Sequence, residues 1–350
     1  MSKYRLTGRA RQAAGIILIA IMLWVIIYAP TPLVIYEPGL TVDTKQLVQL
    51  SGQRDSPEDE EEGAFLLTTI KLTDAKYWQV IQAAWKQDFA VYSKESVMKG
   101  QSEQEYLKIM KLDMTASQNF AMEAAYRYAG ISYATYTELM VGNIYGESKD
   151  IQIGDRIIEA EGKTVNDMVQ FTSAVADKKE GDTVALILQR GDQKISAAVP
   201  YHLLAGNLTV ALVAPVPDGI SLGELNFVKP QEPVNGIEIK AGDIGGPSAG
   251  LMFALQSINL LTGQDLTEGL RIAGTGTLDS LGNVGAIGGI TFKVAAADKA
   301  GAQLFLAPEA NFAEASAKAK ELQSEMKVIP VTSLDTAVSA IHDAAVRINK

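Results

Sequence analysis

The sequence predicts a mixed fold, α+β or α/β, with an N-terminal transmembrane helix, a β-rich middle domain and a C-terminal α/β domain. Three observations support this. The chain has 350 residues, enough for about two domains that each bury a core. Residues 13–29 carry no charge. Residues 132–201 change to short alternating strands with one helix, whereas Gly-rich turns followed by apolar helical segments dominate the C-terminal part.

The apolar segment at residues 13–29 follows a basic flank formed by Lys3, Arg5, Arg9 and Arg11. At about 1.5 Å per residue it spans roughly 25 Å, and residues 33–36 could extend it. We expect a cytoplasmic tail at 1–12 and a transmembrane anchor at 13–36, because a basic flank stays in the cytoplasm. This predicts a single-pass protein of the cell membrane with an extracytoplasmic remainder. The alternative is a signal peptide cleaved after Ala29, a site that Pro30 disfavours.

Composition excludes several classes of function. The net charge is −10 and no basic patch follows the anchor, so we expect no nucleic-acid partner. The chain has no cysteine and two isolated histidines, which excludes a cysteine nucleophile and common zinc motifs. We therefore expect no metal and no cofactor. Gly162-Lys163-Thr164 lacks the upstream glycine of a phosphate-binding loop, since Ile157 stands there, so we expect no nucleotide.

The middle of the chain divides into a linker and a β-rich domain. Residues 37–62 are expected to form a linker with an acidic loop at 55–62. Periodicity then predicts one strand and two helices, followed by two further strands, a short helix and a hairpin. In order these are residues 65–72, 77–89, 103–128, 135–141, 151–158, 167–176, and the hairpin strands 183–189 and 194–199.

The phrase Ile153-Gly154-Asp155-Arg156-Ile157-Ile158 and the elements around it resemble a bacterial PDZ domain. The resemblance implies a PDZ-like domain at 63–204 with a helical insertion and a core at about 132–201. PDZ domains add an extended peptide to a sheet edge. We expect that groove between the 135–141 strand and the 167–176 helix. The alternative is a small domain that only orients its neighbour.

Two Gly-rich motifs carry candidate chemistry: residues 245–250 (GGPSAG) and residues 288–293 (GGITFK). A serine nucleophile needs a base, and with histidine so scarce a Ser248–Lys293 pair is one known solution. A lysine with its ordinary pKa near 10.4 is protonated at neutral pH, so burial must lower the pKa of Lys293. The alternatives are that Ser248 is a helix N-cap and Lys293 a solvated surface residue.

A set of short motifs occurs in order from about residue 208 to the C-terminus. They are Gly246-Pro247-Ser248-Ala249-Gly250, Leu261-Thr262-Gly263, Thr275-Gly276, residues 282–290 (GNVGAIGGI), Lys293, Ala295-Ala296-Ala297, Ala300-Gly301 and Leu306-Ala307-Pro308. With these motifs the segment resembles the proteolytic domain of Lon proteases, which implies a Lon-type domain at 205–350. The resemblance implies that Ser248 is the nucleophile, Lys293 the general base and Thr275 the residue that orients the lysine. It also implies that backbone groups of the serine loop hold the oxyanion and the substrate: Gly245, Gly246, Pro247 and Ala249.

Two positions depart from the Lon pattern. Gly245 stands where many members have Asp, and Thr277 stands where Glu often follows Thr-Gly. These departures leave the Ser248–Lys293 pair intact and weaken the case for a third, acidic residue.

Taken together, the chain resembles the membrane-anchored, PDZ-containing Lon-like proteases of Gram-positive bacteria. The resemblance implies an ATP-independent serine endopeptidase that cleaves peptides or small unfolded proteins, with the PDZ-like domain presenting substrate or gating the site. It also implies a possible homo-oligomer, a hexameric ring. The alternative function is a peptide-binding PDZ scaffold whose protease domain is inactive.

Overall fold

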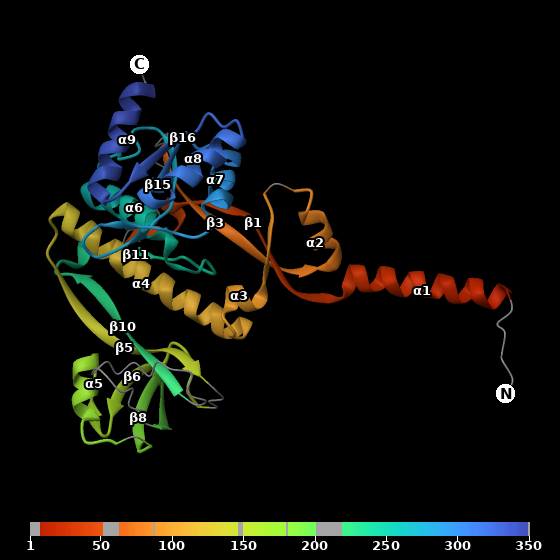
Figure 1. The fold of residues 1–350 in the computed structure, drawn as a ribbon. Helices are drawn as coiled ribbons and strands as arrows, with labels where there is room; N and C mark the ends of the chain where they lie inside the picture. Colours follow the sequence, from red (N-terminus) through yellow and green to blue (C-terminus); the bar gives the residue numbers. More distant parts are fainter. Residues whose placement is uncertain are drawn as a thin grey trace.

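A computed structural model describes residues 8–51, 63–86, 88–145, 150–179, 181–200 and 219–348. The predicted acidic loop at 55–62 and residues 1–7 of the predicted tail lie outside the described residues. The described residues form two structural bodies, and helix α4 (Glu103–Ala129) lies between them in Figure 1.

The first body is built on a six-stranded sheet that joins strands from distant parts of the sequence. The order is β16 (Lys327–Val331), β15 (Leu304–Pro308), β12 (Arg271–Gly274), β3 (Ala64–Lys76), β1 (Pro30–Asp43) and β4 (Ala90–Ser93). Strands β12, β15 and β16 are parallel to one another and to β3, whereas β1 runs antiparallel to both β3 and β4. Strand β15 is buried along its whole length, which explains its unbroken apolar sequence.

This pairing places residues that were predicted as linker inside the sheet. Residues 37–43 form the second half of β1, and β3, assigned above to the PDZ-like region, lies beside β12. Two small sheets complete this body: β2 (Val48–Leu50) with β11 (Ile237–Ile239), and β13 (Thr277–Leu278) with β14 (Val284–Gly285).

The second body is an antiparallel sheet with one helix, α5 (Met168–Ala174), packed on it. Alternating burial along β8 gives the sheet an inner face, where Leu139, Ile157, Leu186 and Leu188 pack against Phe171 of α5. The order is β10 (Gly219–Pro230), β5 (Tyr133–Tyr145), β6 (Arg156–Ala160), β8 (Thr183–Arg190) and β9 (Gln193–Pro200), with β7 (Lys163–Thr164) paired to β6.

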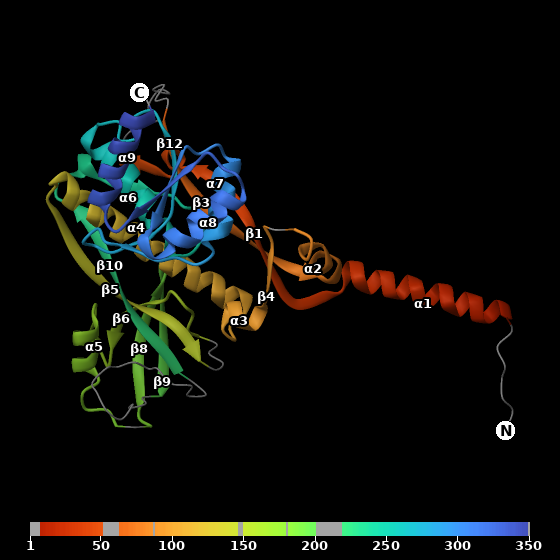
Figure 2. The ribbon, with the colours of Figure 1, turned by 45° about the horizontal axis from the view of Figure 1, so that its top comes forward.

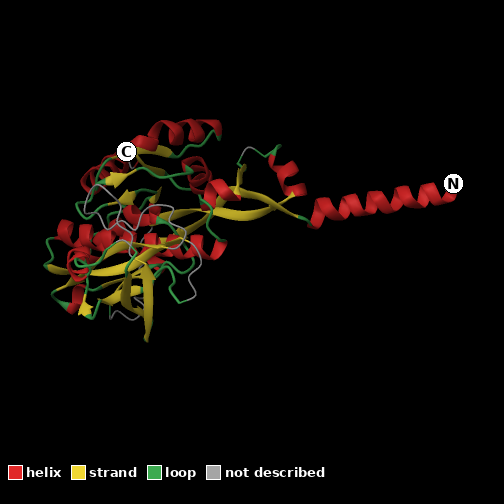
Figure 3. Cartoon of the chain, turned by 60° about the horizontal axis from the view of Figure 1, so that its bottom comes forward, coloured by secondary structure: helices red, strands yellow, loops and turns green. Residues whose placement is uncertain are grey.

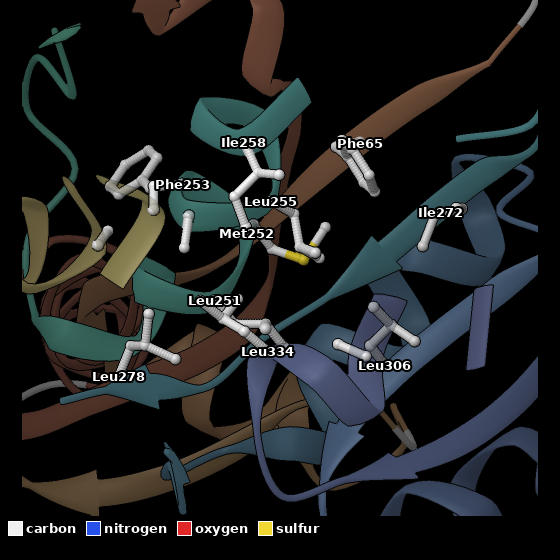
Figure 4. Packing of buried hydrophobic residues seen from close by; sticks show 14 of the residues in the cluster. Phe65, Leu251, Met252, Phe253, Leu255, Ile258, Ile272, Leu278, Leu306 and Leu334 are labelled. Carbon is white, nitrogen blue, oxygen red and sulfur yellow. The ribbon is translucent and has the colours of Figure 1, made fainter. Parts of the chain in front are cut away.

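Helices cover the six-stranded sheet, and Figure 2 shows α6, α7, α8 and α9 gathered around it. Helix α6 (Gly250–Thr262) is buried on every side from Gly250 to Asn259, and this stretch is apolar except for Gln256, Ser257 and Asn259. Its side chains pack against Phe65, Ile272, Leu306 and Leu334 (Figure 4). The remaining helices are α2 (Tyr77–Ala83), α3 (Lys94–Met98), α7 (Ile290–Lys299), α8 (Phe312–Glu321) and α9 (Leu334–Ile348), with short 3-10 turns η1 (Thr44–Gln46), η2 (Pro233–Asn235), η3 (Pro247–Ala249) and η4 (Glu309–Asn311).

Helix α4 begins and ends at strong sequence signals. Ser102 and Glu105 form a capping box at its N-terminus, and Gly130 closes its C-terminus in the left-handed conformation. The predicted helix at 103–128 is therefore confirmed.

Helix α1 (Gly8–Tyr28) projects away from both bodies, as Figure 3 shows. Within the described part of the chain, no helix has both the length and the apolar character needed to cross a bilayer. The predicted transmembrane anchor at 13–36 is therefore wrong, and with it the N-terminal transmembrane helix in the fold class and the single-pass localisation in the cell membrane.

Two features explain this error. Residues 30–36 do not extend the helix, because they form the start of β1 and pair with β3 and β4. The uncharged helical residues that remain, 13–28, rise only about 24 Å, short of the roughly 30 Å hydrocarbon core.

Phe253, on the fully buried part of α6, gives a test of this core. We expect Phe253→Ala to lower the free energy of unfolding by about 3–5 kcal/mol, because it leaves a cavity between α6 and its neighbours. Leu281→Ala, at a side chain that is 65% exposed, is the matched control and should change it by less than about 1 kcal/mol. Chemical denaturation measures both, and equal losses would contradict the packing described.

Candidate active site

Ser248 lies in the short turn η3, directly before the buried helix α6. The turn is entered through Gly246, whose φ of 85° is open to glycine and strained for other residues. The N-cap residues of η3 and α6 are Gly246 and Ala249, so the alternative in which Ser248 is a helix N-cap does not hold. The half-buried Ser248 side chain is instead presented by a rigid turn.

Lys293 lies in the first half of α7 and its side chain is only 4% exposed, so it is not a solvated surface lysine. Its Nζ lies 3.1 Å from the Oγ of Ser248 and donates a hydrogen bond of 2.8 Å to the carbonyl of Thr68 on β3. The structure thus brings together two side chains that are 45 residues apart in the sequence.

Burial changes the protonation of this amine. Loss of solvation around Lys293 lowers its pKa to about 8, since the apolar surroundings disfavour the ammonium ion. The first turn of α7 carries no acidic residue that would counteract this effect. At pH 7 roughly one molecule in ten therefore holds a neutral amine, which can accept the Ser248 proton.

Thr275 was expected to orient Lys293, but in the structure its hydroxyl bonds to the backbone of Ser248. The Thr275 Oγ1 donates to the carbonyl of Ser248 at 2.9 Å, and the backbone N–H of Gly276 donates to the same oxygen at 3.0 Å. The acceptor that holds the lysine is the Thr68 carbonyl. Sequence reasoning missed Thr68 because its contribution is a backbone oxygen, 225 residues away, for which no residue type is required.

The loop that precedes Ser248 is hydrogen-bonded to helix α4. The N–H of Gly246 donates to the Met110 carbonyl at 2.8 Å, and the Ser117 hydroxyl donates to the Pro247 carbonyl at 2.9 Å. Because the Gly246 N–H is engaged and proline has none, neither residue offers a backbone donor to an oxyanion. Of the predicted loop, Ala249 is buried at the start of α6 and Gly245 is exposed beside Met110.

The strand that was expected to line a peptide groove lies inside the sheet of the β-rich body. The expected strand, 135–141, belongs to β5, which pairs with β10 along its length and with β6 at Leu139 and Met140. The side of this strand that pairs with β10 is not open to a peptide, whereas pairing with β6 covers only Leu139 and Met140, so the groove expected beside residues 135–141 stays a prediction. Among the described strands, β10 lies at the end of the sheet, and the N-terminus of α5 is tied to it by the Met168 N–H and the Glu224 carboxylate at 2.7 Å.

The Gly162-Lys163-Thr164 sequence forms a tight turn rather than a loop leading into a helix. Gly162 has a φ of 73°, and Lys163 and Thr164 form β7, paired antiparallel to β6. A phosphate-binding loop instead connects a strand to a helix N-terminus. This geometry agrees with the rejection of a phosphate-binding loop.

Comparison with known protein families gives two matches. Residues 237–343 match the Lon protease (S16) C-terminal proteolytic domain, and residues 146–200 match a PDZ domain. The chain therefore contains the proteolytic domain of a Lon-type serine peptidase together with a PDZ domain.

Several curated proteins are similar over part of the chain. The Lon protease of Aster yellows witches'-broom phytoplasma is 30% identical over 96 residues, which is 27% of this chain and 12% of that protein. The Lon protease of Trichlorobacter lovleyi is 33% identical over 101 residues (28% and 12%), and the archaeal Lon protease of Halobacterium salinarum is 32% identical over 98 residues (28% and 14%). The match thus spans about an eighth of these relatives' length, and it does not tie the chain to Gram-positive bacteria.

The lowered pKa of Lys293 predicts how stability depends on pH. In the unfolded chain the lysine keeps its ordinary pKa near 10.5, so between about pH 8 and 10.5 the unfolded state binds more protons. The contribution of Lys293 to stability should therefore rise with pH across this window. Denaturation of the wild type and of Lys293→Met at several pH values measures it, and identical slopes for the two proteins would contradict a buried, perturbed amine.

Proposed function

We propose that this chain is a serine endopeptidase in which Ser248 is the nucleophile and Lys293 the general base. The observation that carries the proposal is the 3.1 Å contact between the Ser248 hydroxyl and a buried amine whose pKa is lowered to about 8. Nucleophile and base within hydrogen-bond reach, with the base held by a third group, is the arrangement that such catalysis needs. The Thr68 carbonyl supplies that third group.

The reaction follows from these groups. The Ser248 oxygen attacks the scissile carbonyl while its proton passes to the neutral Lys293 amine, giving a tetrahedral intermediate. The backbone N–H groups of Ser248 and Ala249, at the N-terminal end of the η3–α6 segment, stabilise its oxyanion. The Lys293 ammonium then returns the proton to the leaving amine, and the acyl-enzyme forms. Water then attacks the ester carbonyl while its proton passes to the neutral Lys293 amine. The resulting ammonium gives that proton to the departing Ser248 oxygen, so the acyl–oxygen bond breaks, the product acid leaves and Ser248 is restored.

The substrates we propose are peptides and small unfolded proteins, cleaved without ATP. Hydrogen bonds with Thr68, Thr275, Gly276 and helix α4 hold the Ser248–Lys293 pair and its turn. An extended chain suits the PDZ domain, which we propose adds it to β10, at one end of the sheet formed by the described strands, beside α5. A homo-oligomeric ring stays a prediction that native mass spectrometry of the chain would test.

A peptide-binding scaffold with an inactive protease domain is the competing function, and Ser248→Ala separates the two. We expect this variant and Lys293→Met to lower kcat for an unstructured fluorogenic peptide by more than about a thousandfold, because each removes one half of the pair. Lys299→Met is the matched control, since this exposed lysine lies on the same helix. Reactions run with and without ATP should proceed at equal rates.

A wild type that cleaves no peptide, or a Ser248→Ala variant that keeps full activity, would leave only the scaffold function. A strict requirement for added nucleotide would overturn the ATP-independent part alone.

The activity should also depend on pH through Lys293. Since only the neutral amine accepts the serine proton, kcat/KM should rise about tenfold per pH unit below about pH 8 and level off above it. Steady-state kinetics with the same peptide measures this, and a profile that is flat between about pH 6 and 8 would contradict the assigned base.

Peptide binding at β10 can be located by hydrogen exchange. With the Ser248→Ala variant and casein as an unfolded probe, we expect slower amide exchange in residues 219–230, because an added strand pairs with the outer edge of β10. Exchange at Leu139 and Met140 of β5 should stay unchanged, since these residues are already paired with both β10 and β6. Protection that appears in β5 and not in β10 would contradict this location.

A further inference from the structure

Helix α4 holds the turn that carries the nucleophile, and we propose that Ser117 of this helix is a positioning residue for the reaction. The inference rests on the proposed function. Helix α4 lies outside both family matches, 237–343 and 146–200, so neither match assigns it a part in the site.

Two hydrogen bonds fasten the turn to the helix at the residues directly before Ser248. The Gly246 N–H donates to the Met110 carbonyl at 2.8 Å, and the Ser117 hydroxyl donates to the Pro247 carbonyl at 2.9 Å. Met110 and Ser117 are two helical turns apart, on one face of α4. Because carbonyls of a helix point toward its C-terminus and side chains tilt toward its N-terminus, the two groups converge on the same short turn.

The close approach of turn and helix depends on Gly245. A Cβ atom at this position would lie 2.9 Å from the Cβ of Met110, which is nearer than such atoms come in real structures. Ser117 itself is 2% exposed, and a buried hydroxyl costs free energy unless it has a partner. The Pro247 carbonyl is that partner, so the contact is a fixed part of the fold.

The Ser117 contact acts on one specific group of the site. The Pro247 carbonyl and the Ser248 N–H belong to the same planar peptide unit, so they point in opposite directions from it. Holding the carbonyl on Ser117 therefore fixes the direction of the Ser248 N–H, the proposed oxyanion donor. On the other side of Ser248, Thr275 and Gly276 hold the next peptide unit through its carbonyl.

Removal of the Ser117 hydroxyl leaves both reacting side chains in place and releases one peptide plane. An oxyanion donor acts in the transition state and not in substrate binding, so its misalignment lowers kcat and leaves KM unchanged. A hydroxyl with only a packing role would not produce this separation of kcat from KM.

The experiment compares variants of Ser117 in the full chain with the unstructured fluorogenic peptide. We expect Ser117→Ala and Ser117→Cys, whose thiol is a weak donor, to lower kcat about tenfold with KM within about twofold. Ser117→Thr keeps the hydroxyl and should restore kcat to within about threefold of the wild type. Thr115→Ala is the matched control, since that hydroxyl bonds to Lys111 within the same helix and should leave kcat unchanged. Thermal melting of each variant checks that it is folded at the assay temperature.

The outcomes separate this inference from the function on which it rests. Inactive wild type, or active Ser248→Ala, overturns both. An active wild type with Ser117→Ala no slower than Thr115→Ala, or with Ser117→Thr as slow as Ser117→Ala, overturns the positioning role alone.

Discussion

The structure depends on one amine that is kept out of water beside one hydroxyl. Water would hold Lys293 protonated, and a protonated lysine cannot take a proton from Ser248. Three elements that are distant in sequence exclude water here: α7 carries the lysine, β3 offers the Thr68 carbonyl, and α6 follows the serine turn. Burial of such a group is unfavourable for folding, and the apolar packing around α6 offsets that cost.

The six-stranded sheet brings residues from early and late parts of the sequence together at the site. Strand β3 comes from the first quarter of the sequence, yet it pairs with β12, which leads directly to Thr275. Thr68, whose carbonyl accepts from Lys293, therefore lies on the strand next to the one that Thr275 follows, and Thr275 donates to the Ser248 carbonyl. A proteolytic segment defined by its motifs alone, from about residue 205, does not contain the Thr68 carbonyl or helix α4.

Much of the site could be predicted from the sequence because it consists of residue types that chemistry demands. A serine and a lysine after Gly-rich turns, in a chain with two histidines, suggested the pair, and the resemblance to Lon proteases assigned the roles to Ser248 and Lys293. Thr68 and Met110 could not be found this way, since they contribute backbone oxygens that any residue has. The 103–128 helix was also predictable, because its capping residues and its apolar spacing agree. Strand pairing could not be predicted in the same way. Alternation identified the 135–141 strand but not its neighbours, and the sequence did not show that Pro30 and Pro32 lie in β1.

The pairing of β5 with β10 has a consequence for how this architecture arises. Tyr133, where β5 begins, lies opposite Pro230, where β10 ends, so the stretch between them leaves and re-enters the rest of the chain at one point. A segment whose two ends lie side by side can be exchanged for another segment, or replaced by a tight turn, without disturbing the six-stranded body to which it is joined. Recombination could therefore graft unrelated recognition modules at this junction while the hydrolytic core stays whole.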